Sequence, residues 1–297
     1  MITIQTNKIL IPIDFSLTST RAIKHGASIA RLTKGELILL HVQKKTDLVD
    51  IILPAYRLNS TTILTDYLEK KLEKLAVIIR KQYEIAVTCL VSMGNITSEI
   101  VNIAEEYKVG MIIMGTQGKD STNDLFLGSN SYRVITKSTV PIMTIRSEVP
   151  KMGYSNILLP IDSSVHSRQK VNSAIKIANT FAAHLHVLGL LGKHEDNYEY
   201  KLKVILPQIQ KMAHAEKLVC KAEIEKASNR AEKTLAYAKK IKADMIIIMS
   251  DEKTELSGLI LGTYAHQLIN NASIPVLCIP PEIHPENMEM DSIGGMW

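Results

Sequence analysis

Cysteine, aromatic residues and long apolar runs are all scarce in this chain. Its three cysteines, Cys89, Cys220 and Cys278, lie far apart and form no CxxC pair, which argues against a disulfide framework and against a zinc site of paired cysteines. We expect each to be a small buried hydrophobic residue. Aromatic residues make up only 5% of the chain and no dense basic stripe accompanies them, so a nucleic-acid-binding surface is not expected.

No apolar run reaches the roughly 18 residues that a membrane-spanning helix needs. Residues 1–10 also lack the charged start and apolar stretch of a signal peptide. We therefore expect a cytoplasmic protein without membrane contact. The 297 residues are long for a single core and suit two domains.

The chain contains one unit written twice. KILIPIDFS at 8–16 returns as NILLPIDSS at 156–164, a shift of 148 residues that places Asp14 on Asp162. A longer segment near the end of each copy, residues 110–145 and 244–279, aligns without gaps at a shift of 134 residues. The sequence predicts three parts, namely a first domain over 1–147, a second over 152–281 and an irregular acidic tail over 282–297.

Within each copy, short apolar runs alternate with helical patterns, which indicates βαβ units around a parallel sheet. The fold class is α/β, with two tandem doubly wound domains that each hold a five-stranded parallel sheet flanked by helices. For the first copy we expect strands at 8–13, 36–42, 86–92, 110–115 and 140–145. The helices expected between them span 18–33, 60–82, 97–108 and 129–138. Thr18 or Ser19 is expected to cap the first helix, Gly35 follows its end, and Leu64, Leu68, Leu72, Leu75 and Ile79 form the buried stripe of the long second one.

A glycine-rich loop follows the strand expected at 110–115. Its spacing is Gly115-x2-Gly118-x9-Gly128-Ser129, and Gly128 opens a helix whose first amides have no intrahelical partner. Those amides, the positive helix end and the Ser129 hydroxyl suit a phosphate group. Asp14 follows a neighbouring strand, so both features lie at the carboxyl edge of the sheet, where open α/β sheets bind ligands. The loop contains no GxxxxGK[ST] and no dinucleotide-binding GxGxxG.

These segments resemble the universal stress protein family. The similarity rests on ILIPIDFS at 9–16, LLHV at 39–42, and IIMGTQG followed by GSNS, and it extends over both copies. It implies a tandem member with the adenine nucleotide α-hydrolase-like fold and an ATP-binding type of motif in the first copy. It also implies a role in stress response.

The resemblance implies a set of ATP contacts in the first domain. Adenine and ribose would lie near Pro12, Ile13, Asp14 and Val42, with the phosphates over the glycine loop and ATP bound with or without Mg²⁺. Asp14 would accept hydrogen bonds from the nucleoside rather than act as a catalytic base, and no catalytic or metal-ligating residue is assigned. The cofactor-binding residues expected are Pro12, Ile13, Asp14, Val42, Met114, Gly115, Gly118, Gly128, Ser129, Asn130 and Ser131.

The second copy departs from the motif. Met249 and Glu252 stand where the first copy has Gly115 and Gly118, and only Gly262-Thr263 is retained beside Asp162. Negative charge from Glu252 would repel phosphate. Two interpretations stay open for this domain, a degenerate pairing module and a site for a different ligand.

His184 and His186 form an HxH pair, for which two interpretations stay open. The pair could contribute to a zinc site, or His186 could be a core histidine whose ring has a hydrogen-bond partner. The strands at 140–145 and 274–279 are expected to pair the two domains within the chain, and two chains are expected to form a homodimer.

Besides a nucleotide-dependent regulator, the sequence allows two other functions. One is a slow ATP hydrolase or nucleotide-using transferase, and the other is a structural or small-ligand module that binds no nucleotide.

Overall fold

The computed structural model describes residues 7–44, 57–116, 128–146, 153–193, 195–250 and 261–281. The first domain runs β1 (Lys8–Pro12), α1 (Leu17–Thr33), β2 (Glu36–Gln43), α3 (Arg57–Tyr83), β3 (Ala86–Met93), α4 (Ile96–Glu106), β4 (Met111–Gly115), α5 (Ser129–Lys137) and β5 (Ile142–Ile145). The second runs β6 (Asn156–Ile161), α6 (Val165–Arg168), α7 (Val171–Thr180), β7 (His184–Gly192), η2 (Asp196–Tyr198), α8 (Glu199–Ala215), β8 (Cys220–Ala227), α9 (Arg230–Lys240), β9 (Met245–Met249), α10 (Thr263–Asn271) and β10 (Val276–Ile279).

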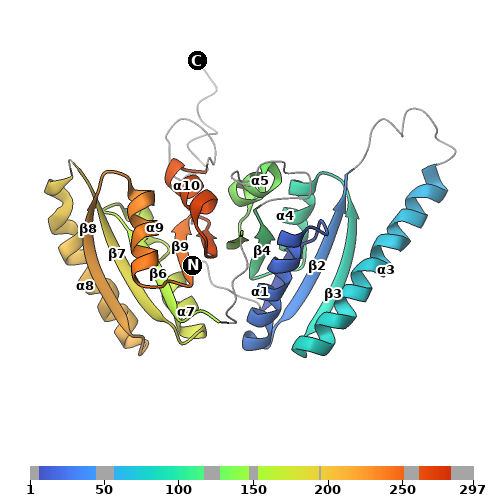
Figure 1. The fold of residues 1–297 in the computed structure, drawn as a ribbon, viewed down its shortest axis with the longest axis horizontal. Coiled ribbons are helices and arrows are strands. Elements are labelled where there is room, and N and C mark those ends of the chain that lie inside the picture. Colours follow the sequence, from blue (N-terminus) through green and yellow to red (C-terminus); the bar gives the residue numbers. More distant parts are fainter. Residues whose placement is uncertain are drawn as a thin grey trace, which may run out of the picture.

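A single ten-stranded sheet crosses both domains, in the order β3-β2-β1-β4-β5-β10-β9-β6-β7-β8. Each half has five parallel strands, and the halves meet where β5 pairs antiparallel with β10. The Thr144 hydroxyl adds a hydrogen bond of 3.1 Å to the Val276 carbonyl oxygen at this seam. The predicted parallel sheets and the predicted pairing of the domains through their last strands are confirmed. Figure 1 shows the two halves of the molecule side by side.

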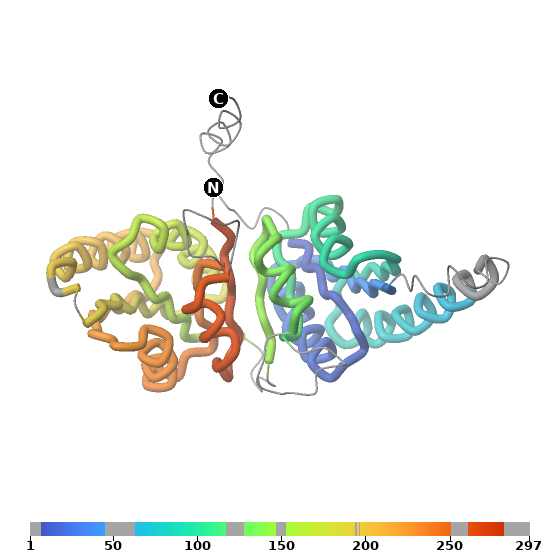
Figure 2. Tube along the Cα trace, turned by 90° about the horizontal axis from the view of Figure 1, so that it is seen from above, coloured from blue at the N-terminus to red at the C-terminus, as the bar shows by residue number. Residues whose placement is uncertain are grey.

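The helices cover both faces of the sheet because its strands are apolar on both sides. In β1, Ile9 and Ile11 face the layer of α1, α3, α7 and α8, whereas Leu10 faces the layer of α4, α5, α9 and α10. Both apolar layers continue from one domain into the other. The two halves therefore share one extended core on each face. Seen from above, the two halves lie side by side, with the red C-terminal elements of the second next to green elements of the first (Figure 2).

Three details differ from the sequence predictions. Ser16, not Thr18 or Ser19, caps α1, because the backbone stays extended through Ser16 (φ −76°, ψ 168°) and its side chain accepts from the Ser19 amide. Lys34, one residue before Gly35, takes the left-handed conformation that ends this helix. Gly35 instead meets a close approach, since a Cβ there would lie 2.0 Å from the Asn7 carbonyl oxygen.

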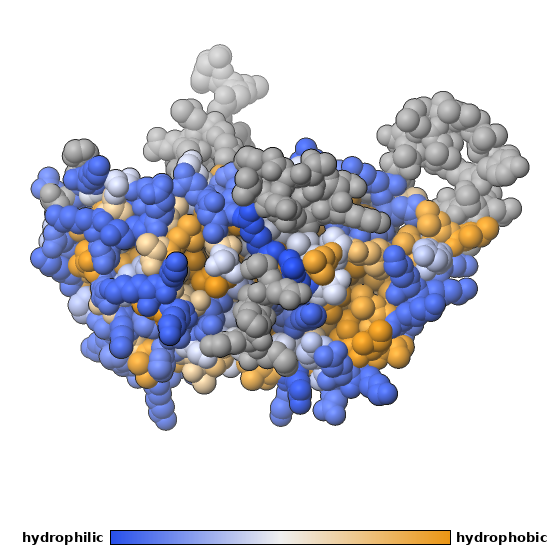
Figure 3. Space-filling view, in the orientation of Figure 1, coloured by the Kyte–Doolittle hydropathy of each residue, from blue (hydrophilic) through white to orange (hydrophobic). Residues whose placement is uncertain are grey.

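Helix α3 is longer than expected and extends past the edge of the sheet (Figure 2). Leu68, Leu72 and Ile79 are buried as predicted, but Leu64 is 41% exposed because that end of the helix lies beyond strand β3. Hydrophobic residues consequently reach the surface along α3 (Figure 3), among them Ile63, Val77 and Ile78.

All three cysteines are free thiols. Cys220 and Cys278 are buried as predicted, whereas Cys89 on the edge strand β3 is only half-buried. Burial raises the pKa of Cys220 to about 11, so this thiol stays protonated at neutral pH. Among the described residues, no helix has both the length and the apolar character that crossing a bilayer requires.

Candidate functional site

A crevice of about 1060 Å³ opens at the carboxyl ends of β1, β2 and β4 in the first domain. Strand order reverses here, since β2 and β3 lie on one side of β1 while β4 and β5 lie on the other. Ten of the eleven predicted site residues line it, namely Pro12, Ile13, Asp14, Val42, Met114, Gly115, Gly128, Ser129, Asn130 and Ser131. The eleventh, Gly118, lies outside the described residues.

The turn from β1 to α1 forms one wall of the crevice. The Asp14 carboxylate accepts from the Ser16 amide at 2.9 Å, which fixes the side chain at the end of the strand. Because α1 begins just after Ser16, the side chains of Thr18 and Ser19 in its first turn also line the crevice. The Thr18 and Ser16 hydroxyl oxygens are 2.9 Å apart. Hydroxyl groups and one carboxylate thus face the space together.

Gly115 is needed where β4 meets α1. A Cβ built on this glycine would lie 2.7 Å from both Cβ and Oγ1 of Thr18, closer than real Cβ contacts come. The Thr18 side chain therefore lies against the backbone at Gly115 and leaves no room for a side chain there. The residue does not adopt a positive φ.

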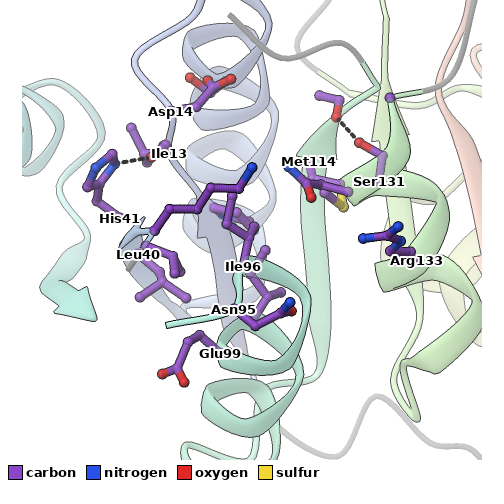
Figure 4. Close-up of a pocket in the computed structure, with 18 of the residues that line it drawn as sticks. Ile13, Asp14, Leu40, His41, Asn95, Ile96, Glu99, Met114, Ser131 and Arg133 are labelled. Atoms are coloured by element: carbon purple, nitrogen blue, oxygen red, sulfur yellow. Dashed lines mark hydrogen bonds between the residues drawn. The ribbon is translucent and has the colours of Figure 1, made fainter. Parts of the chain in front are cut away.

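The start of α5 forms the opposite wall. Gly128 is the N-cap, with no side chain to bond the free amides, and the Tyr132 amide donates to its carbonyl at 3.0 Å. The amides ahead of Tyr132 have no partner within an α-helix, and the positive end of the helix dipole lies with them. The Ser131 hydroxyl donates to the Gly115 carbonyl at 2.9 Å, which holds the helix start against β4 (Figure 4).

His41 holds the backbone at the end of β1, next to Asp14. Nδ1 of His41 donates to the Ile13 carbonyl at 2.6 Å, and its ring lies 5.0 Å from that of Phe15. Phe15 has a φ of 61°, an unusual conformation for a bulky residue. The Lys71 ammonium lies over the Phe15 ring, 3.8 Å from the ring centre. The strained turn is thus held by neighbours from β2 and α3.

Sequence reasoning missed most of the third wall. Asn95, Ile96 and Glu99 at the start of α4 line the crevice, and Arg133 faces it from α5 (Figure 4). Asn95 is the N-cap of α4 and accepts from the Ser98 amide at 3.2 Å. An asparagine three residues before a serine at a helix start is a capping signal, but it does not reveal that the cap lies beside a ligand crevice.

The same architecture is found among known proteins. A sequence model of the universal stress protein family matches residues 5–146 and again residues 153–280. The chain belongs to the universal stress protein family. Universal stress protein MJ0577 of Methanocaldococcus jannaschii is 35% identical over an alignment of 156 positions, and the match covers 47% of this chain and 94% of that protein. Universal stress protein YxiE of Bacillus subtilis is 26% identical and covers 47% of this chain and 99% of its own length.

The tandem arrangement of the two universal stress domains also has a structural counterpart. A universal stress protein from Archaeoglobus fulgidus DSM 4304 has a TM-score of 0.77 at 21% identity, and covers 93% of this chain and 99% of that one. This likeness shows the fold, with both domains in a comparable arrangement. The predicted fold class of two tandem doubly wound domains of the adenine nucleotide α-hydrolase-like type is confirmed.

The second universal stress domain has only a small cavity at the equivalent place, about 90 Å³. Asp162 keeps the arrangement of Asp14 and accepts from the amide and the hydroxyl of Ser164 at 2.9 and 2.6 Å. Burial would raise the pKa of Asp162, but the Ser164 hydrogen bonds and the Lys170 charge outweigh it and hold the pKa below its usual value. The carboxylate therefore stays ionised in this domain.

Two cations occupy this part of the second domain. Lys170 is 4% exposed, and its ammonium donates to the Ser167 carbonyl at 2.8 Å. Burial lowers the pKa of Lys170 to about 8. Arg230, at the start of α9, holds Glu195 through two contacts of 2.6 Å. Sequence reasoning placed negative charge from Glu252 here, but Glu252 lies outside the described residues. The described walls carry Lys170 and Arg230.

The HxH pair is split between two environments. His186 is buried, with Nε2 3.4 Å from the Asn156 side-chain oxygen, and burial lowers its pKa. His184 is exposed at the start of β7. Within the described ranges, no group of three or more His, Cys, Asp or Glu side chains is arranged to hold a metal ion. The geometry of His186 agrees with a core histidine that has a polar neighbour.

Proposed function

We propose that this universal stress protein binds ATP in the first-domain crevice and acts as a nucleotide-dependent sensor or regulator in stress response. The proposal rests on two walls of the crevice that face each other, the start of α5 and the turn that holds Asp14. The open amide end of α5 with Gly128 faces the Asp14 turn across a space of about 1060 Å³. Amides at a helix start favour phosphate, and a carboxylate beside a strand end suits ribose hydroxyls.

The proposal assigns a contact to each predicted residue. Pro12, Ile13, Asp14 and Val42 would contact the nucleoside, and Met114 and Gly115 would lie between it and the phosphates. The phosphates would meet Gly128, Ser129, Asn130 and the Ser131 amide, with Gly118 as a further predicted contact. Arg133 lines the same crevice and would add positive charge near the phosphates. Asp14 and Glu99 are the carboxylates in the described walls that could accompany Mg²⁺.

The assembly and the setting follow from the same proposal. We propose domain limits of 1–147 and 152–281, with 282–297 as a tail, and a cytoplasmic location where ATP is available. We also propose a homodimer. Both edges of β5 and of β10 are already paired within the chain, so a second copy would associate through another surface.

Substitution of Gly128 by valine tests the nucleotide site. Gly128 has φ −61° and ψ 144°, a conformation that valine adopts readily, so the fold should be retained. The added side chain would stand in front of the α5 amides. We expect ATP affinity to fall more than tenfold, about 1.4 kcal/mol or more, as measured by calorimetric titration.

Gly262→Val in the second domain is a matched control, because Gly262 has φ −60° and ψ 151° at the start of α10. We expect it to leave ATP affinity unchanged. Equal affinity in wild type and Gly128→Val would refute the assignment of the α5 amides to phosphate. Adenine nucleotide released on denaturing the purified protein should amount to about one per chain, whereas about two would place nucleotide in both domains.

A further inference from the structure

A second cavity lies between the two domains, at the opposite edge of the sheet from the crevice. It has a volume of about 440 Å³ and is formed where β1 and β4 begin and where α1 and α7 end. These helices lie on either side of the middle of the molecule (Figure 1). Its described lining consists of Asn7, Lys8, Ile9, Ile29, Thr33, Gly110, Met111, Lys176, Ile177, Asn179, Thr180 and Phe181.

The inner part of this junction cavity is apolar and firmly packed. Ile9, Ile29, Met111 and Ile177 are buried residues of the two domains' cores. Phe181 packs edge-on against Tyr154 with ring centres 4.7 Å apart. The Tyr154 hydroxyl oxygen lies 2.9 Å from Nδ1 of His25, which joins the second domain to α1.

The outer part of the cavity is positively charged. Lys8 comes from the first domain and Lys176 from the second. Neither ammonium forms an ion pair or a hydrogen bond with a side chain in the described part of the chain. No carboxylate stands among the described residues that line the cavity. The polar neighbours Asn7 and Thr180 already donate to backbone carbonyls, at 2.7 and 2.9 Å.

We propose that the junction cavity binds a small amphipathic anion, with an aliphatic body against the apolar wall and a carboxylate between Lys8 and Lys176. The volume falls in the range of roughly 300–1000 Å³ that ligand pockets occupy, and such pockets favour domain interfaces. An apolar wall gains free energy by excluding water from an aliphatic chain. The two unpaired lysines select the sign of the head group. This site is separate from the ATP crevice and does not depend on it.

Decanoate, below its micelle concentration, is the probe for the full-length protein. We expect calorimetric titration to show one decanoate per chain, with decanol binding at least tenfold more weakly because it lacks the charge. Thr180→Trp should lower decanoate affinity at least tenfold, since Thr180 is an exposed residue on the cavity wall and its replacement fills the space. Asn172→Trp is the matched control on the same helix, exposed but away from the cavity, and should bind as wild type does.

A double variant tests whether binding needs the positive charges of Lys8 and Lys176. Lys8→Met combined with Lys176→Met should reduce decanoate affinity to that of decanol. Lys24→Met combined with Lys211→Met removes two exposed lysines elsewhere and should change neither affinity. Absence of decanoate binding by wild type, unchanged affinity in Thr180→Trp, or equal binding of decanol and decanoate by wild type would each overturn the proposal.

Discussion

The two domains share one fold, but their equivalent crevices differ more than tenfold in volume, about 1060 Å³ in the first and about 90 Å³ in the second. Several backbone features around the two correspond, namely the retained aspartate, the serine cap and the glycine that opens the last helix. The first helix differs, because α1 is continuous whereas the second domain has the short α6 followed by α7. Among the described residues, side-chain size also differs between the two sites. At four equivalent positions the second domain has the larger side chain. Lys170 stands in place of Ala22, Arg230 of Ile96, Met249 of Gly115, and Tyr264 of Asn130.

The comparison shows how a site is closed without a change of fold. In the second domain the Lys170 ammonium lies beside Asp162, and the Tyr264 hydroxyl lies 3.0 Å from that of Thr234. The larger side chains also leave little volume for a ligand, which agrees with a pairing role for this domain.

The largest predicted effect concerns the internal cation of the second domain. The pKa of Lys170 is about 8 in the folded protein, against 10.5 for an unburied lysine. Between these pH values the unfolded chain holds a proton that the folded chain has released, so raising the pH favours folding. Relative to Lys170→Met, we expect the free energy of unfolding of wild type to rise by roughly 3 kcal/mol from pH 8 to pH 10.5.

Chemical denaturation at a series of pH values measures this difference. The methionine variant keeps the length of the buried side chain but has no group to titrate, so the titration of tyrosines and cysteines cancels in the comparison. Parallel pH profiles for the two proteins would show that folding does not lower the pKa of Lys170.

A transfer of the second domain's side chain into the first domain tests what keeps the crevice open. In Gly115→Met, the new Cβ would meet Thr18 at 2.7 Å and the side chain would enter the crevice. We expect ATP affinity to fall at least a hundredfold, about 2.7 kcal/mol, and stability to fall by about 1–3 kcal/mol from overpacking. Calorimetric titration and thermal unfolding measure the two effects.

The reciprocal variant Met249→Gly provides the control. Met249 is 7% exposed, so its removal should cost about 2–5 kcal/mol of stability. ATP affinity of the first domain should not change. A Gly115→Met protein that still binds ATP as wild type does would mean that the crevice is not the nucleotide site.

The smallest predicted effect concerns the strained turn, which only the first domain has. Phe15 has a positive φ, whereas Ser163 at the equivalent place does not. Lys71→Met removes the cation that lies 3.8 Å from the Phe15 ring centre, and should lower the free energy of unfolding by about 0.5 kcal/mol. Lys70→Met, on the same exposed helix, serves as the control for lost charge. Equal stability of the two variants would show that this contact contributes nothing.

Much of the fold and part of the crevice could be predicted because they are written in local patterns. The alternation of apolar runs and helical stripes located every strand of the first domain within about two residues. Ten predicted residues meet in one crevice because parallel strands present their carboxyl ends at one edge. Asn95 and Glu99 could not be placed in this way, because a helix pattern does not specify which strand end its first turn approaches.

The sequence by itself determined the repeat, the parallel sheets and the position of the glycine-bounded helix start, since each depends on residue spacing within one segment. Only the tertiary structure decided whether each crevice is open. That depends on side chains such as Lys170 and Arg230, which are 60 positions apart and meet because their helices begin at the same edge of the sheet. Packing in three dimensions, rather than the retained motif at Asp162 and Gly262, thus separates the open crevice from the closed one.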